Sequence, residues 1–310
     1  MGTIMTLGEI IVEIMATESG QSFRAPGPLV GPFPSGAPAI FIDQVARLGH
    51  PAAIIGCVGD DDFGWLNIER LRRDGVDTSA IEVVPQAVTG SAFVTNDRSG
   101  ERHFIFTIPN SASAHLSASH VSASVLGDCT HFHVMGSSLF SPAVREAAQK
   151  AIDIVSRKGG RVSFDPNIRP GLLGHPGMRE ALVSILSRTD VFLPSGPELT
   201  LLVNASTDEA AIEELLGLGI SEIVVKQGRQ GCTYHDRTLR LSVPAVVVDE
   251  IDPTGAGDCF SATYVTCRLQ GLPLERSLRY ACAAGALSVT KRGPMEGTGG
   301  FAELDALLSA

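Results

Sequence analysis

Residues 251–260, with the sequence IDPTGAGDCF, place a carboxylate where a helix is expected to begin. Asp258 follows Gly255, Ala256 and Gly257, and it opens an apolar run that predicts a helix ending near Gly271. The first N–H groups of a helix have no partner within the helix, and that end carries a partial positive charge. Glycines let such N–H groups approach a ligand closely. The pattern therefore favours an anion site beside a carboxylate. The alternative is that Asp258 is only a partner of the helix dipole.

Two common phosphate-binding motifs do not fit this stretch. A dinucleotide fingerprint needs a third glycine where this chain has Phe260, and a Walker A loop needs a Gly-Lys-Ser/Thr that does not follow. A nicotinamide oxidoreductase would also need a glycine-rich turn after the first strand, where LGEIIVE offers one glycine.

Other polar residues follow predicted strands and could belong to the same site. Asp165 and Arg169 lie in the segment DPNIR, for which a salt-bridged turn is the alternative. Lys226 ends a predicted strand in VVKQGRQG, where base rates favour a surface lysine. For Glu198 in PSGPE, the alternative to a functional role is that of an acid that interacts with the dipole at the start of a helix. Each residue thus has an ordinary structural explanation beside the chemical one.

The elements that must position these residues alternate between strands and helices. Predicted strands cover residues 3–8, 52–59, 130–136, 161–165, 190–194 and 222–228, and several are continuously apolar, as in strands covered on both faces. Between them, Ser141 and Pro142 begin a helix that ends at Gly159. This alternation predicts a three-layer α/β/α fold with a mostly parallel central sheet. Ligands in such folds bind at the C-terminal ends of the strands.

Two segments interrupt the alternation. Residues 13–35 are rich in Gly, Pro and Ser, and residues 88–108 alternate like a hairpin around NDRSG. We expect these two segments to form a small β-sheet that acts as a lid over the strand ends. Residues 1–12, 36–87 and 109–310 then form the α/β core that binds the ligands.

Composition and charge narrow the functional classes. The chain has 310 residues, of which 44% are apolar, as in globular proteins. Its net charge of −10 and the lack of a Lys/Arg cluster argue against nucleic-acid binding. The sequence has no run of 18 apolar residues, so we expect no membrane span, and the N-terminus does not resemble a signal peptide. The six scattered cysteines fit a cytoplasmic protein with free thiols and argue against a zinc site built from them.

Five segments together resemble the ribokinase-like (PfkB) carbohydrate kinase family. DPTGAGDCF is similar to the C-terminal signature of that family, and four further blocks occur in the family's order: PSGAPAIFIDQVARLG, GCVGDDDFG, DPNIR and VVKQGRQG. The resemblance spans nearly the whole chain. It implies a ribokinase-like fold and transfer of a phosphoryl group from ATP to a sugar, with Mg²⁺ and a monovalent cation such as K⁺ as cofactors.

The resemblance also implies roles for individual residues. Asp258 would be the general base for a sugar hydroxyl, and the N–H groups of Gly255, Ala256 and Gly257 would form the anion hole. The remaining residues fall into three groups. The implied sugar-binding residues are Glu13, Gly36, Ala37, Asn167 and Arg169. Phe104 of the lid is a further sugar-binding candidate, because it could cover an apolar face of the sugar; packing in the lid or core is its alternative. The implied nucleotide-binding residues are Lys226, Gly228, Gly231 and Thr254. The implied metal-binding residues are Glu198 and Asp252, although a local turn bond is the alternative for Asp252.

Departures from the family pattern bear on the substrate. Glu13 stands where an aspartate is common, Ile40 replaces a usual asparagine, and Ser195 replaces another. Residues 100–117 resemble the lid of 2-keto-3-deoxygluconate kinases, which would place an arginine where this chain has Ile108. Lack of that arginine favours a neutral ketohexose such as fructose or tagatose, phosphorylated at a primary hydroxyl. The alternatives are a 2-keto-3-deoxygluconate kinase, a nucleoside kinase and a non-catalytic sugar sensor on the same fold. The exposed edges of a lid sheet also predict a homodimer.

Overall fold

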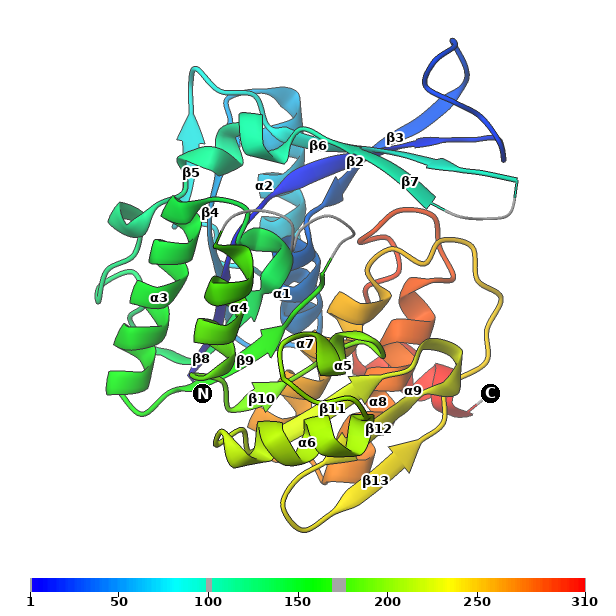
Figure 1. Ribbon diagram of the computed structural model, residues 1–310. Helices are drawn as coiled ribbons and strands as arrows, with labels where there is room; N and C mark the ends of the chain where they lie inside the picture. Colours follow the sequence, from blue (N-terminus) through cyan, green and yellow to red (C-terminus); the bar gives the residue numbers. More distant parts are fainter. Residues whose placement is uncertain (1, 99–101, 169–176, 310) are drawn as a thin grey trace.

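The computed structural model describes residues 2–98, 102–168 and 177–309 (Figure 1). Within these residues, nine strands form the main sheet in the order β13-β12-β11-β10-β9-β8-β1-β4-β5. All neighbours from β11 to β5 pair in parallel, and only the hairpins of β12 and β13 run antiparallel. The strands are β1 (Thr3–Leu7), β4 (Ala52–Gly59), β5 (Ile81–Val84), β8 (Cys129–Met135), β9 (Arg161–Asp165), β10 (Val191–Phe192), β11 (Glu222–Lys226), β12 (Cys232–His235) and β13 (Arg240–Val243).

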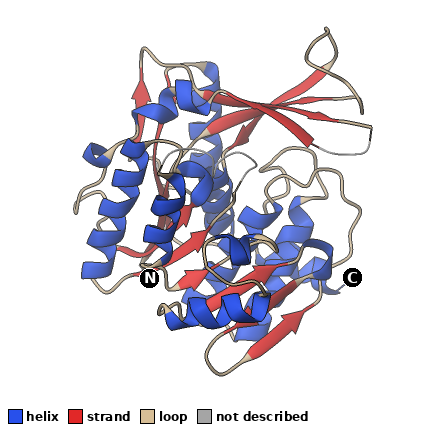
Figure 2. Cartoon of the chain, in the orientation of Figure 1, coloured by secondary structure: helices blue, strands red, loops and turns tan. Residues whose placement is uncertain are grey.

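Helices cover both faces of this sheet (Figure 2). Strand β4 illustrates the reason: Ile54 and Val58 belong to one apolar core, whereas Ile55 and Cys57 belong to the other. Successive side chains of a strand point to opposite faces, so a continuously apolar strand needs helices on both sides. One face packs against α1 (Ala37–Arg47), α2 (Asp62–Arg73), α7 (Ala256–Leu269), α8 (Leu274–Ser288) and α9 (Phe301–Ser309). The other packs against α3 (Pro142–Arg157), α4 (Met178–Leu186), α5 (Glu198–Leu201) and α6 (Asp208–Gly217). The predicted three-layer fold is thereby confirmed.

Short 3₁₀ helices connect several of these elements. They are η1 (Ile108–Asn110), η2 (Ala112–His115), η3 (Ala118–His120), η4 (Gly136–Ser138) and η6 (Gly228–Gln230). Across the described ranges, no helix has both the length and the apolar character needed to cross a membrane.

A second, small sheet projects from the main body at the top of Figure 1. Its order is β3-β2-β6-β7, with the bounds β3 (Leu29–Ser35), β2 (Ile11–Ala16), β6 (Gly90–Asn96) and β7 (Arg102–Phe106). The two predicted segments meet where β2 pairs in parallel with β6, and β6 and β7 form the predicted hairpin. The predicted small sheet is therefore present. That it moves as a lid on a separate core stays a prediction.

Candidate active site

The N-terminus of α7 has the predicted arrangement of glycines and a carboxylate. Gly255 precedes the helix with φ of 86°, and a Cβ at this position would lie 2.6 Å from the Pro294 carbonyl oxygen. Only glycine therefore fits this turn without strain. The helix begins at Ala256, which places Asp258 in its first turn, largely buried.

A cavity of about 320 Å³ lies between this helix end and the small sheet. Asp258 lines it together with residues 253–257, and the small sheet contributes Glu13 and Phe104. Gly36 and Ala37 at the start of α1 line it as well. The cavity therefore brings together segments that are more than 200 positions apart in the sequence.

A second cavity, of about 490 Å³, is mostly apolar and lies on the other side of the α7 turn. Gly228 and Gly231 line it, as do Val246, Phe260 and Val289. Five residues line both cavities: Ser195, Lys226, Pro253, Ala256 and Gly257. A molecule in one cavity would therefore meet a molecule in the other at the N-terminus of α7.

Lys226 is a buried residue of this shared wall, so the interpretation as a surface lysine is wrong. Its ammonium group pairs with a carboxylate oxygen of Asp165, and the same oxygen accepts a hydrogen bond of 2.9 Å from Ser261. A Cβ on Gly257 would lie 3.5 Å from the Lys226 ammonium nitrogen. The ammonium group of Lys226 therefore lies against the turn that begins α7, where its charge adds to the positive potential of the helix end.

Asn167 connects the strand β9 side of the cavity to Asp258. Its amide nitrogen donates to Asp258 Oδ1 over 3.3 Å, and its backbone has a positive φ of 40°. The N–H of Asn167 donates to Asp165 Oδ1, so residues 165–167 turn around the side chain of the aspartate. The predicted sugar-binding residue Arg169 lies outside the described residues.

Glu198 is buried beside the shared wall at the start of α5. Its two carboxylate oxygens accept backbone hydrogen bonds, from Ile168 over 2.6 Å and from Ser195 over 2.7 Å. Burial raises its pKa, and the negative charge of Asp165 raises the pKa further. A cation in the cavity would relieve this crowding of carboxylates.

Arg102 is a cavity residue that sequence reasoning missed. From β7 it contacts Glu13 Oε1 at 3.2 Å and donates to the Thr254 hydroxyl over 2.6 Å, and its guanidinium lies 4.9 Å from the Phe104 ring centre. Ile108, in contrast, lines neither cavity. An arginine therefore reaches the site from another position of the same segment, and the match of Ile108 to the family arginine stays a prediction. Only a three-dimensional register could have shown this.

Thr254 and Asp252 belong to the same polar network. Thr254 lines the smaller cavity and not the larger one, which differs from its predicted grouping with Gly228 and Gly231. Asp252 accepts from the Thr254 N–H and hydroxyl over 3.0 and 2.7 Å, and from the Gly293 N–H over 3.0 Å. The turn bond expected as the alternative for Asp252 is thus present.

Comparison with known proteins agrees with this geometry. Residues 1–298 match the model of the pfkB family carbohydrate kinases. Fructokinase-1 of Oryza sativa subsp. japonica is 33% identical over 301 residues, which cover 94% of this chain and 92% of that protein. A structure titled "putative Ribokinase II in complex with ATP and Mg+2" from E. coli has a TM-score of 0.97 and 52% identity, covering 100% of this chain and 99% of that one. A fructokinase double mutant from Vibrio cholerae O395, in a form with fructose, ADP and potassium ion bound, has a TM-score of 0.87 and 27% identity, covering 99% and 98%.

The fold and the paired cavities thus define a ribokinase-like sugar phosphotransferase. The chain belongs to the pfkB family of carbohydrate kinases, and it is fructokinase-like.

Proposed function

We propose that this protein transfers the γ-phosphoryl group of ATP to a primary hydroxyl of a neutral ketohexose such as fructose or tagatose. The observation that carries the proposal is the wall shared by the two cavities, which holds Lys226, Ala256 and Gly257. Phosphoryl transfer needs donor and acceptor in line, with charge neutralised between them. A helix N-terminus at the junction of two cavities provides that geometry.

The larger cavity suits the nucleotide. Its apolar residues Val246, Phe260 and Val289 can pack against a purine base, and Gly228 and Gly231 lie close to the shared wall. A Cβ on Gly231 would lie 2.0 Å from the Val243 carbonyl oxygen, so the turn there requires glycine. The E. coli structure, which contains ATP and Mg²⁺, supports ATP as the nucleotide.

Asp258 would act as the general base. It lines the smaller cavity, which we assign to the sugar and call the sugar cavity, and it could accept the hydroxyl proton there as the bond to phosphorus forms. The N–H groups of Gly255, Ala256 and Gly257 would stabilise the charge that develops on the transferred oxygens. Closure of the small sheet over the cavity would exclude water and suppress ATP hydrolysis.

Two cations fit residues of the site. Glu198 and Asp165 give the buried carboxylate oxygens that Mg²⁺ prefers, and their mutual repulsion favours a cation nearby. Bound there, Mg²⁺ would neutralise the nucleotide phosphates. For a monovalent cation such as K⁺ we propose Asp252, whose buried carboxylate already orders the loop before α7. The potassium ion in the Vibrio cholerae structure supports such a cofactor.

The charges of the sugar cavity favour a neutral substrate. Its described lining contains four acids and two bases: Glu13, Asp165, Glu198 and Asp258 against Arg102 and Lys226. Both bases are already paired with acids of the same cavity. A sugar carboxylate would therefore enter a site with an excess of negative charge, whereas the hydroxyls of a ketohexose can donate to these carboxylates.

The small sheet also offers a surface for a homodimer. Leu29 and Ile105 are apolar and exposed there, and the outer strands β3 and β7 leave edges to be covered. We propose that two copies associate through these sheets.

An assay of ADP release over a panel of sugars tests the substrate. With ATP and Mg²⁺ we expect turnover with fructose or tagatose and a lower kcat/KM for 2-keto-3-deoxygluconate and for adenosine. Phosphorus NMR of the product should show a phosphate on a primary carbon. A preference for the acidic sugar would instead support the 2-keto-3-deoxygluconate kinase.

A further inference from the structure

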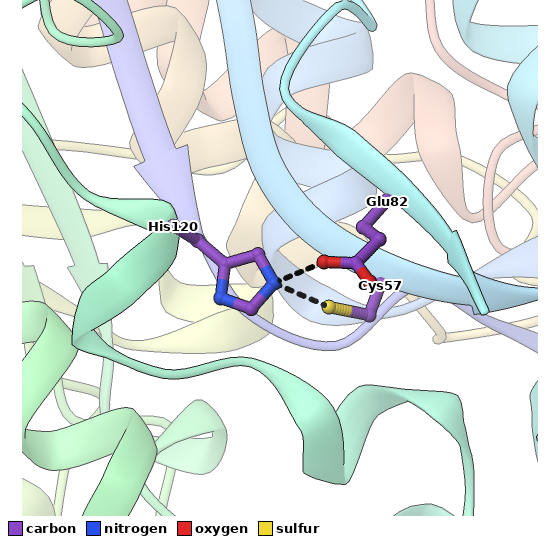
Figure 3. A group of neighbouring side chains, drawn as sticks. All are labelled: Cys57, Glu82 and His120. Carbon is purple, nitrogen blue, oxygen red and sulfur yellow. Dashed lines mark hydrogen bonds and ion pairs between the residues drawn. The ribbon is translucent and has the colours of Figure 1, made fainter.

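Three potential metal ligands from separate segments meet at the edge of the main sheet (Figure 3). Cys57 lies on β4 and Glu82 on β5, where the two residues are direct partners in the parallel pairing. His120 ends the 3₁₀ helix η3. The His120 Nε2 atom lies 3.6 Å from Cys57 Sγ and 2.6 Å from Glu82 Oε2, and all three ligand atoms lie within 4.8 Å of one another.

We propose that Cys57, Glu82 and His120 bind a divalent cation of the zinc type at a site separate from the active site. A thiolate, an imidazole and a carboxylate are the three side chains that bind Zn²⁺ in proteins, and three protein ligands leave a fourth position for water. Mg²⁺ prefers oxygen ligands, so this site and the kinase site select different ions. None of the three residues lines either described cavity of the active site.

The distances are close to those of a tetrahedral site. With a Zn–S bond of about 2.3 Å and a Zn–N bond of about 2.0 Å, tetrahedral angles put sulfur and nitrogen about 3.5 Å apart. The observed separation between Cys57 Sγ and His120 Nε2 is 3.6 Å. The same geometry needs about 3.4 Å between nitrogen and the carboxylate oxygen, so Glu82 must withdraw by roughly 0.8 Å. Its side chain is 55% exposed and can make this movement, and it also gives an ion access from solvent.

The surroundings of His120 support a ring bound through Nε2. Without metal, the Ser117 N–H donates to Nδ1, and Nε2–H can donate to Glu82. With metal on Nε2, the proton moves to Nδ1, which lies 3.2 Å from both the carbonyl oxygen and the hydroxyl oxygen of Ser117. A protonated Nδ1 can no longer accept from the Ser117 N–H, so that hydrogen bond is lost when the metal binds. A ring N–H that donates to a backbone carbonyl is the usual second partner of a metal-binding histidine.

A catalytic cysteine is the competing interpretation of the same three residues. Cys57 is completely buried, so its thiol is out of reach of a substrate. A thiol buried in this way is a poor nucleophile. A bound cation instead stabilises the thiolate directly. The metal site is therefore the chemistry that the cluster supports.

Metal binding by the whole protein tests the proposal. Chelator-treated protein is dialysed against Zn²⁺ with an excess of Mg²⁺ to occupy the active site, and bound zinc is measured by atomic spectroscopy. We expect one zinc per chain, and with Co²⁺ a thiolate-to-cobalt absorption band. Cys57→Ser and His120→Gln should each weaken zinc binding by at least about 100-fold, since loss of a ligand costs no less than loss of its second partner. Cys57→Ser should also lose the cobalt band.

Matched variants separate this site from adventitious binding. Cys129→Ser removes another buried thiol, and His115→Gln removes an exposed histidine of the neighbouring 3₁₀ helix, so both should bind like the wild type. If Cys57→Ser fails to fold, the half-buried His120→Gln still decides the question. The proposal is overturned if zinc binding is far below one per chain, if either ligand variant binds as tightly as the wild type, or if wild-type protein gives no cobalt–thiolate band.

Discussion

Replacing Asp258 by asparagine separates a catalytic carboxylate from a helix-dipole partner. The substitution keeps the size of the side chain and an oxygen that can accept from Asn167, now 3.3 Å from Asp258 Oδ1. It removes the negative charge and with it the capacity to accept a proton. Asp258 lines the smaller cavity but not the larger cavity. We therefore expect turnover to fall while nucleotide affinity is retained.

The expected loss follows from the role of a positioned base. General-base catalysis contributes about 10²- to 10⁴-fold, which corresponds to about 2.7 to 5.4 kcal/mol at 1.36 kcal/mol per factor of ten. A helix-dipole partner contributes only about 0.3 to 1 kcal/mol, and it contributes to stability and not to kcat. The two roles therefore differ both in size and in the quantity that changes.

Three measurements test this prediction. Steady-state kinetics with the best sugar give kcat, calorimetry gives the affinity for ATP, and thermal unfolding gives the stability. Asp62→Asn is a matched control, because Asp62 is an exposed acid in the first turn of α2 and lines neither cavity. The control should lose a little stability and keep its kcat. If Asp258→Asn keeps a kcat within threefold of the wild type, the assignment of the base is refuted.

Three further substitutions test other parts of the structure. Lys226→Met leaves the carboxylate of Asp165 buried without its cation and should lower the free energy of unfolding by about 3 to 5 kcal/mol in urea titrations; a loss below 1 kcal/mol would contradict the buried pair. Glu198→Gln removes a charge at the proposed magnesium site and should raise the Mg²⁺ concentration for half-maximal activity at least tenfold, and an unchanged requirement would move the metal elsewhere. Ile105→Lys puts a charge on the exposed face of β7 and should turn a dimer into a monomer in light scattering; a wild-type monomer would refute the proposed interface.

Local sequence patterns predicted the helices and strands well, because the interactions that start and end these elements lie between residues close in the sequence. The helix start at Ala256 depends on Gly255, whose turn no other residue fits, and the start of α3 depends on Ser141, whose hydroxyl accepts from the Val144 N–H. Continuous apolar runs such as β4 predicted that helices cover both faces of the sheet. The alternation of strands and helices and the position of Asp258 in the first turn of α7 followed from these signals.

Contacts across the cavity could not be predicted because they depend on the register between remote segments. Lys226 gave no sequence signal of burial, since its partner Asp165 is 61 positions away. Arg102 reaches Glu13 from a strand 89 positions away, and a shift of one residue along β7 would turn its side chain to the other face. The Cys57, Glu82 and His120 cluster depends in the same way on the pairing of β4 with β5.

The contacts of Arg102 join the small sheet to the loop before α7, and we propose that they couple sugar binding to closure of that sheet. Arg102 belongs to the small sheet, and its bond to the Thr254 hydroxyl joins that sheet to the loop that precedes α7. Arg102 lies 3.2 Å from Glu13 Oε1, which is longer than a strong charge-assisted N–H bond of about 2.7 to 2.9 Å. The Thr254 hydroxyl lies 3.3 Å from the same oxygen, but it donates its single proton to Asp252 over 2.7 Å. A sugar hydroxyl that donates to Glu13 over about 2.5 to 2.7 Å would therefore compete well with these contacts. Because the Thr254 loop leads directly into the anion site of Gly255, a sugar held by Glu13 would be sensed where the phosphoryl group is transferred.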